Sequence, residues 1–132
     1  MTRKILLIVT IIEAVTFFIA AALHYGLKIS VLEEPKIVPA RIVETLCGIF
    51  LTIAAFAIGR HAKKARGIAT AAHIFSIAGV LLGMGALAMG RGPTTELNYY
   101  YHRTILVVLI IMLIILFTST GKVALQAGSK IE

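Results

Sequence analysis

The sequence predicts an all-α integral membrane protein, a four-helix bundle whose helices run up, down, up and down across the bilayer. The chain is 59% hydrophobic and 14% charged, whereas soluble domains are about 45–50% apolar and about 25% charged. Its apolar residues fall into four long runs with short polar segments between them. At 132 residues the chain is long enough for one domain, so we expect residues 1–132 to form a single transmembrane domain.

The four apolar runs give the expected spans. They cover residues 5–23, 42–58, 68–89 and 104–120. Each is close to the ~20 residues that a helix needs to cross a hydrocarbon core ~30 Å thick. A spanning helix also satisfies its own backbone hydrogen bonds in lipid. Turn residues separate the runs. Proline precedes the second span, and glycines follow both the second and the third spans. Thr95 is among the candidate N-caps of the last helix.

The distribution of Lys and Arg predicts that both termini are cytoplasmic. With the N-terminus inside, the cytoplasmic segments hold eight of these residues and the outer segments hold five. The densest basic cluster, residues 60–66, lies in the short second loop, where the positive-inside rule is most reliable. We therefore expect a multi-pass protein of the cell membrane. Because the charges sit beside membrane spans, we exclude nucleic acid as a partner despite a net charge of +7.

The third span carries small residues at helical spacing, among them Ser76, Gly79 and Gly83. A GxxxG pair lets two helix backbones approach closely in lipid. Two interpretations follow. The Gly79/Gly83 face contacts a second copy of the chain in a homo-oligomer, or it contacts a neighbouring helix of the same chain. The single cysteine, Cys47, excludes an internal disulfide and is expected to pack inside the second span.

Ionisable residues inside a span are costly, by about 2.5–3.5 kcal/mol on insertion scales. Glu44 lies inside the second span, and His24 and His102 lie at the ends of the first and fourth. The predicted topology places all three at one depth near the outer surface. Such residues are able to bind a transition metal, grip a haem between the two histidines, or hydrogen-bond a quinone head group. Supporting residues at the same level are Arg41, Arg103, Tyr25 and Tyr101. In the alternative structural interpretation, the histidines are interfacial residues and Glu44 pairs with Arg41 or Arg103.

A second polar group is expected deeper in the membrane. Glu13 lies near the middle of the first span, and His73 lies about one helical turn away in depth on the third. A hydrogen bond between them requires that the first and third spans touch. Glu13 in the first of four short helices resembles the arrangement in small multidrug transporters, and that resemblance implies a residue that couples protons to export. The chain contains no tryptophan and matches no other motif of that family.

No motif of a soluble enzyme chemistry is present, since the Walker, Rossmann, HExxH, GxSxG and kinase patterns are all missing. We therefore do not expect an enzyme. The leading hypothesis is a bundle that binds a small ligand (haem, metal ion or quinone) at the outer His/Glu cluster. The runner-up is an oligomeric proton-coupled transporter or channel that uses Glu13 and His73. A third is an accessory packing subunit of a larger membrane complex.

Overall fold

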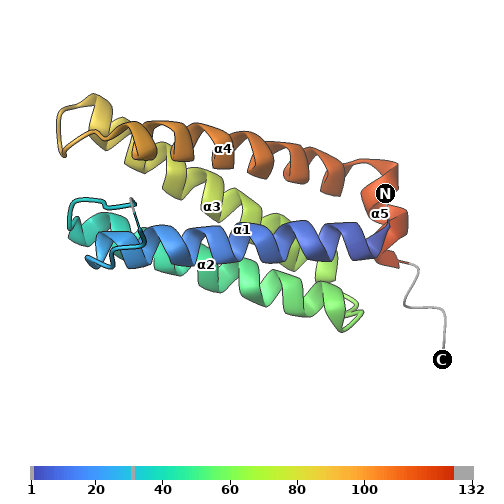
Figure 1. Ribbon diagram of the computed structural model, residues 1–132. Coiled ribbons are helices and arrows are strands. Elements are labelled where there is room, and N and C mark those ends of the chain that lie inside the picture. The colour runs from blue at the N-terminus through green and yellow to red at the C-terminus, as the bar shows by residue number, and fades with distance from the viewer. Residues whose placement is uncertain (1, 31, 127–132) are drawn as a thin grey trace.

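The computed structural model describes residues 2–30 and 32–126 of the chain. All regular elements in these residues are helices, which confirms the predicted fold class (Figure 1). Four long helices are followed by one short one: α1 (Arg3–His24), α2 (Val38–Gly59), α3 (Ala65–Ala88), α4 (Glu96–Phe117) and α5 (Ser119–Gln126). The four long helices are each long and apolar enough to cross a membrane, so the chain is a multi-pass membrane protein by length and composition.

The first two helices extend the predicted spans at both ends, and α3 begins before residue 68 and ends at Ala88, just before the predicted residue 89. The last helix differs more at both ends. α4 begins at Glu96 because Thr95 caps it, its side chain accepting a hydrogen bond from the Asn98 amide at 3.0 Å. The helix ends at Phe117, short of the predicted residue 120, and the chain turns at Thr118 into α5. Gly121 lies so close to the Ile115 carbonyl that a Cβ would not fit there.

The bundle has two distinct ends (Figure 1). The loops at residues 25–37 and 89–95 lie together at one end, which we call the loop end. The N-terminus, the turn at residues 60–64 and α5 lie at the opposite end, which we call the terminal end. This arrangement agrees with the predicted up-down-up-down order. Which end faces the cytoplasm stays a prediction.

Small residues set how closely the helices pack. α1 and α2 form the most extensive pair, followed by α2 with α3 and α3 with α4, whereas α1 and α4 touch little. Buried alanines line the inward faces of the first three helices, and a Cβ on Gly48 would lie 2.8 Å from the Phe18 ring. Large apolar side chains such as Ile8, Phe56 and Leu82 are exposed on the outer faces. Such faces suit contact with lipid.

The glycines of the third helix pack inside the chain. A Cβ on Gly79 would lie 2.9 Å from Cγ1 of Val43 and 3.1 Å from Sγ of Cys47, both on α2. A Cβ on Gly83 would lie 3.3 Å from Nε2 of His102 on α4. Of the two interpretations of this face, the contacts therefore match the one in which it packs against neighbouring helices of the same chain.

Candidate functional site

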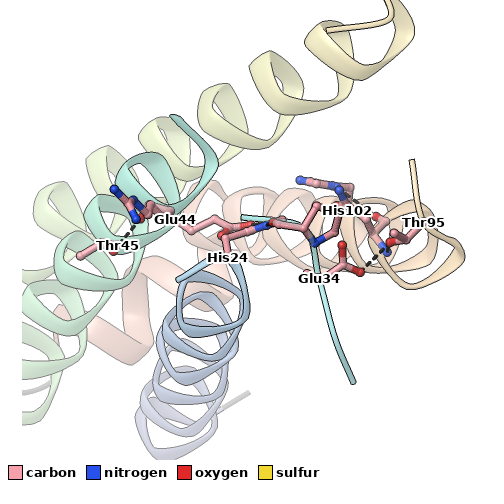
Figure 2. Close-up of polar contacts among 9 residues, drawn as sticks. His24, Glu34, Glu44, Thr45, Thr95 and His102 are labelled. Atoms are coloured by element: carbon pink, nitrogen blue, oxygen red, sulfur yellow. Dashed lines mark hydrogen bonds and ion pairs between the residues drawn. The ribbon is translucent and has the colours of Figure 1, made fainter. Parts of the chain in front are cut away.

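His24 and Glu44 meet at the loop end of the bundle (Figure 2). His24 is the last residue of α1, and Glu44 lies in the second turn of α2. Both are buried, at 2% and 5% exposure, and Nε2 of His24 lies 3.6 Å from Oε1 of Glu44. The other ring nitrogen, Nδ1, lies 2.8 Å from the carbonyl oxygen of Pro35. The sequence predicted that these two residues share a depth, and the structure brings them into contact.

The Pro35 carbonyl defines the protonation of this pair. A carbonyl oxygen only accepts hydrogen bonds, so Nδ1 of His24 carries a proton and donates it. Nε2 then faces Glu44 either as a lone pair or as a second N–H. A lone pair against a carboxylate in a buried site would be repulsive, so either Nε2 or Glu44 carries one further proton, although 3.6 Å is too long for a hydrogen bond between them. The His24–Glu44 pair is therefore electrically neutral, whichever partner holds that proton.

His102 uses the same geometry but keeps its second nitrogen free. Its Nδ1 lies 3.0 Å from the carbonyl oxygen of Asn98, one turn earlier on α4, and so donates to it. Its Nε2 faces Gly83 on α3, where the lack of a side chain leaves room. No hydrogen bond among the described residues uses this Nε2. His102 therefore presents a hydrogen-bond acceptor with a fixed tautomer.

A cavity of about 340 Å³ lies beside these residues, and Glu44 and His102 both line it. Its walls come from the first turns of α2 and the last turns of α3, with Asn98 of α4 and Phe17 of α1 also reaching it. Most of the lining is apolar. Leu82, one of its lining residues on α3, is 71% exposed, so the cavity reaches the outer surface of the bundle beside α3.

Several buried polar atoms at this cavity have no hydrogen-bond partner among the described residues. They are both carboxyl oxygens of Glu44 and the side-chain oxygen of Asn98. A buried polar group without a partner costs about 1–3 kcal/mol, and such groups are rare in folded proteins. Two residues that line the cavity, Glu44 and Asn98, therefore carry unsatisfied acceptors.

Hydrogen bonds among Glu34, Thr95 and Asn98, which we call the strap, join the first and third loops at the loop end. The sequence did not predict the strap. The hydroxyl of Thr95 donates to Oε1 of Glu34 at 2.6 Å, and the same oxygen of Thr95 accepts from the Asn98 amide (Figure 2). Glu34 is only 7% exposed although it belongs to the first loop. The sequence predicted Thr95 as a candidate cap of the last helix but did not indicate its contact with Glu34. A carboxylate in a loop gives no signal of burial, because the burial of Glu34 depends on contact with Thr95 in the third loop.

The predicted supporting residues take other roles. The guanidinium of Arg41 lies 4.7 Å from the ring centroid of Tyr25, and that of Arg103 lies 3.4 Å from the ring centroid of Tyr99. Neither arginine forms an ion pair with Glu44 among the described residues. The ring of Tyr101 packs edge-on against Phe17, which lines the cavity. The arginines are therefore held at the surface by tyrosine rings.

The deeper pair, Glu13 and His73, forms directly. Nε2 of His73 lies 3.0 Å from Oε2 of Glu13, and its Nδ1 lies 2.7 Å from the Ala69 carbonyl. The two residues are 0% and 1% exposed, so the pair is sealed inside the bundle. By the same reasoning as for His24, Nδ1 is protonated and one further proton lies between Nε2 and the carboxyl group. The hydrogen bond that the sequence left conditional is present.

The placement of the His, Cys, Asp and Glu side chains does not support a metal site in the described residues. Among residues 2–30 and 32–126, no three His, Cys, Asp or Glu side chains are placed to hold a metal ion. His24 turns its Nε2 to Glu44 and does not line the cavity. His102 is thus the one histidine of the outer cluster with a free nitrogen at the cavity, whereas a haem gripped from both sides needs two.

No protein-family model, no curated protein and no solved structure matches this chain.

Proposed function

We propose that this protein binds the head group of a lipid-soluble quinol in the cavity at its loop end. The observation that carries the proposal is the carboxyl group of Glu44. It is buried, lines the cavity, and has no hydrogen-bond partner for either oxygen among the described residues. A ligand that donates hydrogen bonds to Glu44 would satisfy these oxygens.

The size and lining of the cavity suit such a ligand. Small-molecule sites are typically about 300–1,000 Å³, mostly apolar, with a few polar groups that orient the ligand. This cavity has about 340 Å³, and its main polar groups are Glu44, Asn98, His102 and the exposed Arg91 at the rim. It reaches the surface of the bundle beside the exposed apolar side chain of Leu82. A ligand dissolved in the bilayer would enter by that side without crossing a polar barrier.

The direction of the hydrogen bonds favours the reduced form of the ligand. Nε2 of His102 accepts, because Nδ1 of the same ring donates to Asn98. When the proton of the His24–Glu44 pair lies on His24, the carboxylate of Glu44 also only accepts. The hydroxyl groups of a quinol donate hydrogen bonds, whereas the carbonyl groups of a quinone only accept them. Glu44 and His102 therefore complement a quinol better than a quinone.

Titration of the purified protein in detergent with short-chain ubiquinol and ubiquinone tests the proposal. We expect the quinol to bind more tightly, and Glu44→Gln to lower quinol affinity about tenfold or more, because the amide replaces one carboxyl oxygen by a hydrogen-bond donor. Arg103→Gln is the matched control, because this exposed residue adjoins His102 in sequence but stacks on Tyr99. Equal affinity for both redox forms, or an unchanged affinity in Glu44→Gln, would overturn the proposal.

A steric pair of variants tests the location of the site. Gly83→Leu places a side chain beside Nε2 of His102 and in the cavity, whereas a Cβ at Gly85 meets nothing within 4 Å. We expect Gly83→Leu to abolish quinol binding and Gly85→Leu to preserve it. Loss of binding in both variants, or in neither, would place the ligand elsewhere.

A second candidate function is proton-coupled transport, and the sealed Glu13–His73 pair is the observation that favours it. A neutral carboxyl–imidazole pair at 3.0 Å in the bundle core is able to exchange one proton. Uptake of a cationic dye into vesicles under a pH gradient tests this function. Transport by the unmodified protein that Glu13→Gln abolishes would support it, and absence of any gradient-driven flux would exclude it.

A further inference from the structure

The terminal end of the bundle carries a second, larger cavity that the proposed function does not use. This groove has a volume of about 870 Å³ and lies between the turn after α2, the start of α3, the end of α4 and α5. One wall follows a single face of α3, with Arg66, Thr70 and Ile74 spaced about one helical turn apart. Phe117 of α4 and Leu125 of α5 contribute to the opposite wall.

The lining of the groove is basic at one end and apolar at the other. Basic residues, His61, Lys63 and Arg66, line the part nearest the end of the bundle. Further along α3 the lining is apolar, with Ile74 and Phe117 51% and 57% exposed. A molecule with an anionic head and an apolar tail would match both parts at once.

Arg66 lies where the basic and apolar parts of the groove meet, and its side chain is fixed by two contacts. Its Nε donates to the carbonyl oxygen of Leu116 at 2.8 Å, and its guanidinium lies 5.8 Å from the ring centroid of Phe117. These contacts fix the side chain and use one of its five N–H groups. The remaining N–H groups have the planar arrangement that binds phosphate oxygens.

The charge of the surrounding residues indicates that the molecule bound in the groove is negatively charged. The described residues at the terminal end include seven Lys and Arg side chains: Arg3, Lys4, Arg60, Lys63, Lys64, Arg66 and Lys122. Glu33, Glu34, Glu44 and Glu96 lie toward the loop end and Glu13 lies mid-bundle, so no described carboxylate balances this charge. The neutralising anions must therefore come from outside the described part of the chain.

We propose that this groove binds one anionic phospholipid of the surrounding bilayer. The phosphate lies against Lys63, His61 and Arg66, and an acyl chain follows the exposed apolar strip of Ile74 and Phe117. A phospholipid satisfies both halves of the groove, whereas a free phosphate ion would leave the apolar half empty. Basic residues at a membrane surface attract anionic lipid in this way.

Native mass spectrometry of the purified protein with added phosphatidylglycerol or phosphatidylcholine tests the proposal. We expect one phosphatidylglycerol to be retained in preference to phosphatidylcholine. Lys63→Gln should weaken that retention about fivefold, the effect of one basic residue near a membrane surface. Lys4→Gln removes the same charge at the same end but outside the groove, so it should leave the specific adduct unchanged.

A steric variant separates a groove from diffuse attraction. Gly67 lines the groove, and a Cβ there meets nothing within 4 Å, so Gly67→Leu fills the groove without disturbing the protein. We expect Gly67→Leu to abolish the retained lipid. Equal losses in Lys4→Gln and Lys63→Gln, retention in Gly67→Leu, no lipid preference, or full displacement by inorganic phosphate would each overturn the proposal.

Discussion

The bundle contains two histidine–glutamate pairs of the same chemistry in different surroundings. In both, Nδ1 of the histidine donates to a backbone carbonyl and Nε2 faces a carboxyl group. The Glu13–His73 pair is closed at 3.0 Å and sealed, whereas His24 and Glu44 are 3.6 Å apart beside an open cavity. Along α1 the two histidine–glutamate pairs are about 16 Å apart. The comparison teaches that the fit of the surrounding helices, and not the residue types, decides whether such a pair is available to a ligand.

The largest expected effect comes from breaking the sealed pair. His73→Leu leaves the Glu13 carboxyl group without a partner in a dry core, and we expect a loss of about 3–5 kcal/mol in the free energy of unfolding. His24→Leu should cost less, about 1–3 kcal/mol, because Glu44 lines a cavity that ligand or water reaches. Unfolding in detergent micelles, followed by circular dichroism, measures both. Equal losses would show that the two surroundings do not differ energetically.

Replacing both members of the sealed pair sharpens the comparison. Glu13→Leu combined with His73→Leu removes both polar groups together, and apolar replacement of a whole buried pair is often neutral or stabilising. We expect the double variant to regain most of the stability that His73→Leu alone loses. A double variant as unstable as the single one would mean that the pair also orders the surrounding helices. The same unfolding measurement decides between the two.

An intermediate effect is expected at Gly79, which lines the cavity on α3 and packs against α2. Gly79→Leu forces a side chain against Val43 and Cys47, and overpacking of this kind costs about 1–3 kcal/mol. Gly85→Leu on the same helix meets open space and should change stability by less than about 0.5 kcal/mol. A tolerated Gly79→Leu would indicate that α2 and α3 separate easily at this point.

The smallest effect is expected at the strap of the loop end. Thr95→Val removes the cap of α4 and the hydrogen bond to Glu34, and loss of an N-cap costs about 0.5–2 kcal/mol. The sealed pair should be unaffected, so hydrogen exchange should increase in residues 96–99 and not around His73. Faster exchange around His73 as well would mean that the two regions open together.

The candidate site was only partly predictable. Position along a span follows from the sequence, which predicted one depth for His24, Glu44 and His102; in the structure Glu44 contacts His24 and lines the cavity together with His102. The sequence did not indicate that His24 would turn away from the cavity, since that orientation depends on the Pro35 carbonyl in the first loop. Glu34 was missed for a similar reason, because its burial arises from contact with Thr95, 61 residues later.

By itself, the sequence determined that this chain forms four apolar helices in an up-down-up-down bundle with polar groups at two depths. It did so because hydropathy and helical periodicity are local properties of each segment, and they decide which segments are stable in lipid. The tertiary structure alone decided which polar groups meet, which cavity stays open and which nitrogen stays free. These outcomes depend on the rotation and spacing of the helices, which small residues such as Gly48, Gly79 and Gly83 set through contacts distant in the sequence.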